Sequence, residues 1–283
     1  MAKLVQYCTR ASLYDGPFDA KVGWAAAGMG YILLSDDGTI TVIDGGHPED
    51  GAALTEAIKL FHVLSLGKPA VVEQWIITHP HGDHYGALLA IAQNPSLAGQ
   101  IRVKNLIYCF PEAFRDKNGG GIGYALRDME KIRDTFGARV QTPAAGESRV
   151  AGGLTFTYLF VPSDCTGLNN PKQLSLIFTV EGTKKALFTG DAYRNTLQMA
   201  ADAFPAALKC DILQLPHHGL CDTGNADFYR LADADTVLVP ISIAGDRTMA
   251  SDMYGDAPAV NRAACERASA VYKAFEGTKV LEL

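Results

Sequence analysis

Hydrophobic and polar positions alternate in short blocks along the chain, and most of these blocks predict β-strands. Residues 31–44 ("YILLSDDGTITVID") contain two β-rich runs on either side of Asp36-Asp37-Gly38, which is typical of a hairpin. The apolar run 71–77 is bounded by turn residues and is short enough for a buried strand. Further strands are predicted at 101–110, 154–162, 174–180, 185–191, 211–219, 236–242 and 279–283.

Helical spacing of apolar residues appears between these strands. Apolar residues from Leu54 to Leu64 follow it, and Gly67 then supplies a C-cap. Further helices are predicted at 85–92, 124–138, 194–204 and 258–275. No low-complexity linker interrupts this order, so we expect one domain over residues 1–283. Strands in both halves end in polar side chains, which favours two sheets packed face to face, helices outside and a site along one rim.

Composition narrows the class of protein without naming a function. The chain has 283 residues, 48% of them hydrophobic, which is enough for a large core. A net charge of -6 argues against a protein that coats long nucleic acid. No apolar run approaches the roughly 18 residues of a membrane span and no signal peptide is recognisable, so we expect a cytoplasmic protein. The six dispersed cysteines are expected to be reduced, with metal binding by Cys165 or Cys221 as an alternative.

The sequence "HPHGDH", residues 79–84, is the strongest candidate for chemistry. In an extended segment His79 and His81 point the same way and can bind one cation together. Asp83 and His84 follow the turn at Gly82 and can therefore reach a second position nearby. A single histidine is usually an ordinary hydrogen-bonded residue, but four candidate ligands in six positions indicate a metal site. Imidazole and carboxylate suit zinc, and also manganese or iron.

This cluster resembles the His-x-His-x-Asp-His signature of the metallo-β-lactamase superfamily. "VIDGG", "LFTGD" and "LQLPHHG" are similar to that family's first motif, its bridging aspartate strand and its late histidine motif. The resemblance implies an αββα sandwich, in which two packed mixed β-sheets carry helices on their outer faces. The order of "NN...SL", "FTGD" and "PHHG" most resembles the subgroup of DNA-uptake channel proteins and phosphorylcholine esterases.

The resemblance also implies roles for individual residues. Asp191 has its own physical case, because a carboxylate at the end of an apolar strand is costly to bury without cations, although a helix N-cap is an alternative. Asp44 is expected to organise the ligand loop without touching metal. Catalytic roles are expected for Asp83 and for His218, the latter as a donor behind the ligands or a proton shuttle. The implied metal ligands are His79 and His81 for one ion, Asp83 and His84 for the other, Asp191 between them, and His217.

One departure from the family pattern is clear. Most members have a further histidine ligand before the bridging aspartate, but no histidine occurs from Phe110 to Gly190. The loop 162–176 offers Asp164, Asn169 and Asn170, of which Asn169 or Asn170 is the expected substitute. An amide oxygen is a weaker zinc ligand than imidazole, so the ion at His79 and His81 should bind less tightly.

A metal lowers the pKa of bound water from about 15.7 toward about 7, which favours hydrolysis at neutral pH. The subgroup resemblance favours a phosphodiester or phosphate ester, and the acidic composition favours a small-molecule substrate. A nuclease on single-stranded nucleic acid, a thioesterase or lactamase, and a non-catalytic metal-binding domain are the alternatives. The glycine-rich stretch 118–124 is interpreted as a flexible lid or as a simple surface loop. The sequence does not determine the oligomeric state.

Overall fold

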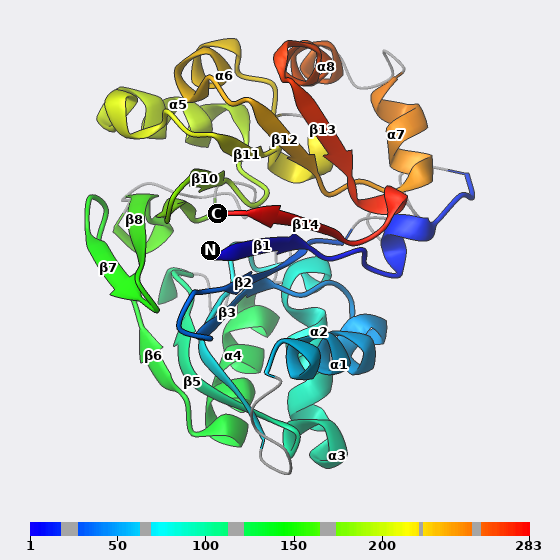
Figure 1. The fold of residues 1–283 in the computed structure, drawn as a ribbon, viewed down its shortest axis with the longest axis vertical. Helices are drawn as coiled ribbons and strands as arrows, with labels where there is room; N and C mark the ends of the chain where they lie inside the picture. The colour runs from blue at the N-terminus through cyan, green and yellow to red at the C-terminus, as the bar shows by residue number, and fades with distance from the viewer. Residues whose placement is uncertain (18–27, 63–68, 113–121, 165–173, 221–222, 251–255) are drawn as a thin grey trace.

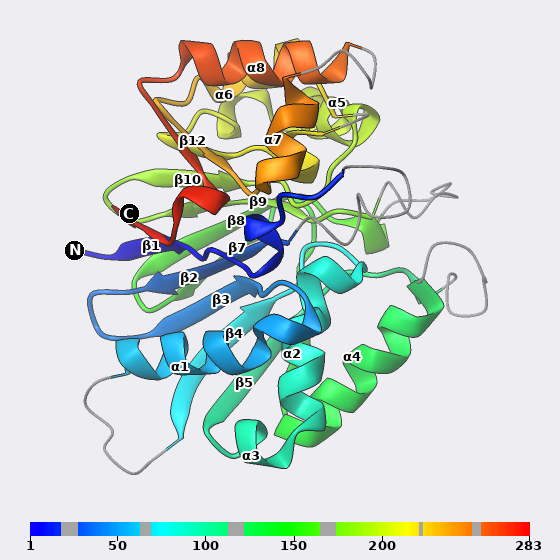
Figure 2. The ribbon, with the colours of Figure 1, turned by 90° about the vertical axis from the view of Figure 1, so that its right-hand side faces the viewer.

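The computed structural model describes residues 1–17, 28–62, 69–112, 122–164, 174–220, 223–250 and 256–283. Within these residues, two seven-stranded sheets pack face to face, and helices cover the outer face of each sheet (Figures 1 and 2). Both sheets contain parallel and antiparallel neighbours. The expected αββα sandwich of two mixed sheets is therefore confirmed.

The first sheet has the strand order β14-β1-β2-β3-β4-β5-β6. Neighbouring strands pair antiparallel from β14 through β1 and β2 to β3. They pair parallel from β3 through β4 and β5 to β6. Four α-helices lie on its outer face: α1 (Gly51–Phe61), α2 (Gly82–Gln93), α3 (Pro95–Ala98) and α4 (Ile122–Phe136). Its strands are β1 (Lys3–Gln6), β2 (Gly30–Leu34), β3 (Ile40–Asp44), β4 (Ala70–Ile76), β5 (Ile101–Ile107), β6 (Arg139–Gln141) and β14 (Lys279–Glu282).

The second sheet has the order β13-β12-β11-β10-β9-β8-β7, parallel from β13 to β10 and antiparallel from β10 to β7. The helices α5 (Arg194–Ala203), α6 (Ala226–Ala232) and α8 (Ala257–Arg267) lie on its outer face, and α7 (Ile243–Met249) lies beside them (Figure 2). Its strands are β7 (Ser148–Ala151), β8 (Leu154–Phe160), β9 (Ile177–Glu181), β10 (Lys185–Phe188), β11 (Ile212–Gln214), β12 (Thr236–Val239) and β13 (Ala270–Lys273).

Side-chain alternation along the strands separates the core into layers. On β2, Tyr31 and Leu33 face the second sheet, where Tyr31 packs edge-on against Phe188. Ile32 between them points the other way, into the layer beneath α1 and α2. This period of two is the expected geometry of strands that are buried on both faces.

The carboxyl ends of β3, β4, β10 and β11 meet at one rim of the sandwich. Two backbone hydrogen bonds connect segments at this rim, one from the residue before β9 to the segment after β4 and one between the segments after β11 and β10. Leu176 N donates to Thr78 O across the two sheets (2.9 Å), and His217 N donates to Gly190 O (3.1 Å). The rim is therefore a fixed meeting point of both halves of the chain, as the sequence predicted for the site.

The predicted helix over 258–275 is wrong in its second half. The helix α8 ends at Arg267, and Ala270–Lys273 forms the edge strand β13, which pairs with β12. The predicted strand 211–219 also stops early, at Gln214. Pattern reading missed the short elements β1, β6, β7, α6 and α7 altogether. Among the described residues, no helix combines the length and the apolar sequence needed to cross a bilayer.

Candidate metal centre

Four turns at the rim carry the predicted site residues. The chain leaves β4 through Thr78 and His79 and enters α2 with His81 as the extended N-cap residue. Asp83 and His84 therefore lie in the first turn of α2, where the helix dipole favours a carboxylate. The remaining turns follow β3, β10 and β11, and they carry Asp44, Asp191, His217 and His218.

One group of four side chains can hold a metal ion. Asp83, His84, Asp191 and His218 each offer one ligand atom, and these atoms all lie within 4.8 Å of one another. His218 Nε2 is 3.1 Å from Asp83 Oδ2 and 3.5 Å from Asp191 Oδ1. His84 Nε2 is 3.2 Å from Asp191 Oδ2. Two imidazoles and two carboxylates thus converge from three distant chain segments.

A second group of three shares one member with the first. It comprises His79, His81 and Asp191, again with ligand atoms within 4.8 Å of one another. His79 Nε2 lies 3.0 Å from His81 Nδ1. Because Asp191 belongs to both groups, its carboxylate lies between two neighbouring positions for a cation.

Two buried atoms at the centre support a metal on physical grounds. His84 Nε2 and Asp191 Oδ1 are inaccessible to solvent, and neither makes a hydrogen bond of normal geometry with any described residue. Such atoms are costly unless something pairs with them, and buried carboxylates in addition require a compensating positive charge. A divalent cation satisfies both needs, so these residues fit a metal ion.

Asp44 lies behind this centre and belongs to neither ligand group. Its carboxylate accepts hydrogen bonds from Thr78 N (2.8 Å) and Thr78 Oγ1 (2.7 Å), and its Oδ2 lies 2.9 Å from His84 Nδ1. The backbone of Asp44 adopts the uncommon left-handed region at φ 55°. Asp44 therefore fixes the ring of His84 so that Nε2 faces the other ligands.

Two other histidines are oriented in the same way. His79 Nδ1 lies 3.0 Å from Ser175 Oγ, and His218 Nδ1 donates to the carbonyl oxygen of Pro240 (2.6 Å). In each ring one nitrogen is held from behind, and the other faces the proposed metal position. Ser175 and Pro240 were not assigned these roles from the sequence, because the contacts join segments far apart in the chain.

The charges at the centre oppose the effect of burial. Burial alone would lower the pKa of His84, but Asp191, Asp44 and Asp83 raise it well above its ordinary value. Burial alone would raise the pKa of Asp191, but His84 and the histidines near it hold it well below its usual range. In contrast, burial and the neighbouring His81 keep the pKa of His79 well below that of a free imidazole. In the metal-free centre these charges therefore favour the protonated form of His84 and the ionised form of Asp191.

The structure distinguishes His217 from His218. His218 belongs to the group of four, whereas His217 belongs to neither group and its Nε2 is 3.8 Å from Asp191 Oδ2. The resemblance favoured His217 as the ligand, and the choice between the two histidines stays a prediction. Both residues and the following Gly219 have positive φ values (46°, 57° and 76°), so they lie in a left-handed turn and not on the extended strand that was expected here.

Several sequence-based candidates fall outside the described residues. These are Asn169 and Asn170 as substitutes for the missing histidine, the alternative ligands Cys165 and Cys221, and most of the glycine-rich stretch 118–124. Their assignments remain predictions. The cysteines within the described residues, Cys8, Cys109, Cys210 and Cys265, form no disulfide with one another.

Comparisons with known proteins agree with this architecture. The family model of the metallo-beta-lactamase superfamily matches residues 28–165. The metallo-beta-lactamase fold protein YhfI from Bacillus subtilis is similar at 16% identity and a TM-score of 0.56, with 100% of both chains covered. Zn(2+)-bound PqqB from Methylobacterium extorquens gives 13% identity and a TM-score of 0.57, with 100% of both chains covered.

A third similar structure, the diiron beta-hydroxylase CmlA from Streptomyces venezuelae, has 14% identity and a TM-score of 0.51 over 99% of this chain and 54% of the CmlA chain. No curated protein matches the sequence. At such low identities the likeness concerns the fold alone. Together with the two packed sheets, it shows that the chain has the αββα fold of the metallo-β-lactamase superfamily. The Asp/His groups that could hold a metal ion lie at the rim of this fold.

Proposed function

We propose that the protein is a metal-dependent hydrolase that acts on a small phosphodiester or phosphate ester. The observation that carries this proposal is the shared position of Asp191 between two groups of candidate ligands, all of them buried except the half-buried His81. When bound, metal ions supply a coordinated water of lowered pKa and neutralise charge that develops on a phosphoryl oxygen. Zinc is the proposed metal, as one or two ions, and manganese or iron also suits the donor set.

The chain's own residues bind the ions, orient the ligands and supply a proton. Asp83, His84 and Asp191 bind the ions, and we assign His218 to the same set in place of His217. Asp44 and Ser175 orient the imidazoles through the contacts described above. His217 then takes the role first given to His218: its Nε2, 3.8 Å from Asp191 Oδ2, holds a proton for the departing alcohol.

The second ion needs more donors than the described residues supply. His79 and His81 come with only one carboxylate, and we propose that Asn169 or Asn170 adds an amide oxygen. The preference for phosphate esters rests on the resemblance of "NN...SL", "FTGD" and "PHHG" to the phosphorylcholine-esterase subgroup.

A metal analysis combined with a hydrolysis panel tests the proposal. The panel contains bis(p-nitrophenyl) phosphate, p-nitrophenyl phosphate, a chromogenic cephalosporin, a thioester and a single-stranded oligonucleotide. We expect bound transition metal, loss of activity on chelation, and faster hydrolysis of the phosphodiester than of the cephalosporin. A reversed preference would assign the protein to the lactamase class, and full metal content without any hydrolysis would indicate a non-catalytic domain.

A further inference from the structure

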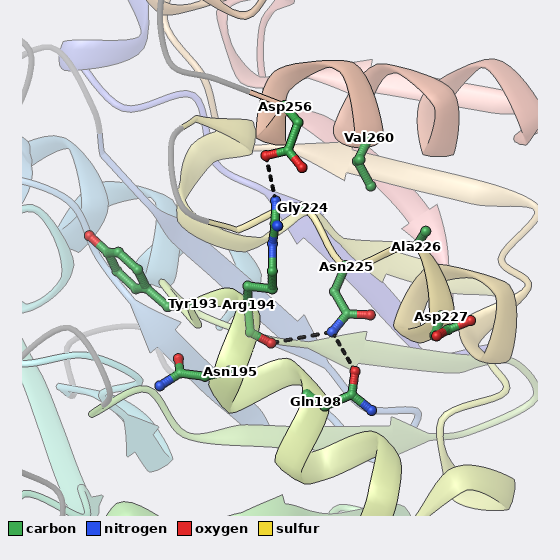
Figure 3. Close-up of a pocket in the computed structure, with 10 residues that line it drawn as sticks. All are labelled: Tyr193, Arg194, Asn195, Gln198, Gly224, Asn225, Ala226, Asp227, Asp256 and Val260. Carbon is green, nitrogen blue, oxygen red and sulfur yellow. Dashed lines mark hydrogen bonds and ion pairs between the residues drawn. The ribbon is translucent and has the colours of Figure 1, made fainter.

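A polar groove of about 700 Å³ lies where α5, α6 and α8 meet (Figure 3). Arg194 crosses it from the start of α5, and its Nη2 donates to Asp256 Oδ1 beside the start of α8 (2.7 Å). Asn225 lies in the middle and donates to Arg194 O (3.2 Å) and Gln198 Oε1 (3.1 Å). The part-buried bonds of Asn225 connect the start of α6 to α5 before any ligand binds, which lowers the entropic cost of binding.

The groove adjoins the metal centre along the chain and through ring contacts. Arg194 follows Asp191 by three residues, which span at most about 10 Å. Tyr193 lines the groove, and its ring centroid lies 5.0 Å from that of His217. His217 Nε2 is in turn 3.8 Å from Asp191 Oδ2. The groove and the metal centre therefore lie within the length of an ordinary small molecule of each other.

The chemistry of the lining discriminates between kinds of ligand. One guanidinium (Arg194) and two carboxylates (Asp227 and Asp256) give a formal charge of +1 - 2 = -1, which opposes an anionic ligand. A cationic ligand would use the carboxylates and leave the guanidinium and amide N–H groups unpaired. A hydroxyl group both donates and accepts, so it can use every polar group of this lining. The Arg194–Asp256 pair places donors beside acceptors, which matches two adjacent hydroxyl groups.

We propose that this groove binds the alcohol portion of the ester, and that this alcohol is an uncharged, hydroxyl-rich group of the glycerol or sugar type. The inference rests on the proposed hydrolase function and specifies its substrate class. The reacting phosphate would lie at the metal centre, and the hydroxyl groups would contact Arg194 and Asp256.

Three matched chromogenic diesters test the proposal in the metal-loaded protein. Each is a p-nitrophenyl phosphate diester, and the second alcohol is ethanol, glycerol or choline. We expect the KM of the glyceryl ester to be about tenfold lower than that of the ethyl ester, because two more hydrogen bonds form. The difference should appear in KM with a similar kcat, since the hydroxyl groups bind equally in the ground and transition states.

Variants locate the effect in the groove. Arg194→Ala and Asp256→Asn should each bring the KM ratio of the glyceryl and ethyl esters close to one. Arg133→Ala is the matched control, because Arg133 also pairs with one neighbouring carboxylate through Nη2 (2.7 Å to Asp134 Oδ1) and should keep the ratio. Saturation-transfer NMR with sorbitol and the metal-free protein gives a readout without catalysis, and Asp256→Asn should abolish the signal.

The possible failures are distinguishable. Hydrolysis of all three esters with equal KM values, or no sorbitol signal, would overturn the groove assignment and leave the hydrolase proposal in place. Preference for the choline ester would replace the hydroxyl-rich ligand by a cationic one. No hydrolysis of any ester by the metal-loaded protein would refute the proposed function and this inference with it.

Discussion

The two ligand groups at the rim differ in how they are assembled. The group of four takes Asp83 and His84 from α2, Asp191 from the end of β10 and His218 from the turn after β11. The group of three takes both histidines from one short turn and shares Asp191. The first group supplies four candidate ligands, the number that a tetrahedral zinc site uses, whereas the second supplies three among the described residues. Two neighbouring positions with one common carboxylate should therefore bind metal with unequal affinity.

The strongest test of this comparison removes the residue that both groups share. Asp191→Ala should empty both positions and lower activity by about a thousandfold or more. Metal analysis after gel filtration and the rate on bis(p-nitrophenyl) phosphate measure the two effects. Asp202→Ala, an exposed carboxylate on α5, is the control and should bind metal normally. Unchanged metal content in Asp191→Ala would remove the basis for treating the groups as neighbours.

The next test separates the adjacent histidines. His218→Ala should lose the tightly held ion, because Nε2 of His218 faces Asp83 and Asp191. His217→Ala should retain both ions and slow hydrolysis by about a hundredfold, as expected for loss of a general acid. Stepwise titration with zinc and a chromophoric chelator measures affinity in each variant. Loss of metal in His217→Ala alone would restore the order that the sequence favoured.

Each residue that orients a ligand from behind should affect the metal affinity of one group. Asp44→Asn should weaken the tight ion about 10- to 100-fold, because His84 loses the acceptor that fixes its ring. Ser175→Ala should weaken the other ion by a smaller factor, since Ser175 Oγ lies 3.0 Å from Nδ1 of His79, a member of the group of three. The same titration resolves the two effects, with Ser148→Ala as an exposed serine control. Equal weakening of both ions by either change would contradict the separation of the groups.

The pH dependence follows from the charges at the group of four. The raised pKa of His84 stabilises the metal-free fold below its unfolded value of about 6.5, and this contribution is lost as pH rises through the folded pKa. The lowered pKa of Asp191 stabilises the fold above about 3.9, and this is lost as pH falls. Zinc must displace the protons of His84 and His218, so the increase in Tm on adding zinc should grow with pH. Differential scanning calorimetry between about pH 6 and 9 checks this, and a constant increase would contradict it.

The smallest expected effect concerns the weaker ion. Asn169→His or Asn170→His should tighten it by about tenfold, because imidazole is a better zinc donor than an amide oxygen. Only the asparagine that faces the metal should respond, so the other serves as the control. If neither change has an effect while the two ions differ in affinity, the missing donor is another residue, such as Asp164 or Cys165.

The features that were predicted correctly from the sequence are local. The hairpin at residues 36–38, the buried strand β4 and the cluster at 79–84 each lie within one short window of pattern. The errors arise where distant partners decide the structure. Residues 270–273 become a strand because they pair with β12. The contact of Ser175 with His79 was not predicted either, because the two residues are 96 positions apart. The left-handed turn that carries His217 and His218 was also not predicted, and which of the two is the ligand stays a prediction.

The long separation in sequence between the ligands of the group of four has a consequence for biosynthesis. The group of four brings together residues 83 and 218, which are 135 positions apart, so most of the chain must leave the ribosome before the centre can close. Until then His79 and His81 are already synthesised and can bind metal as an incomplete pair. Contacts of such long range also slow folding, because a large loop must close before they form. Binding of the ion at the group of four should therefore mark the end of folding.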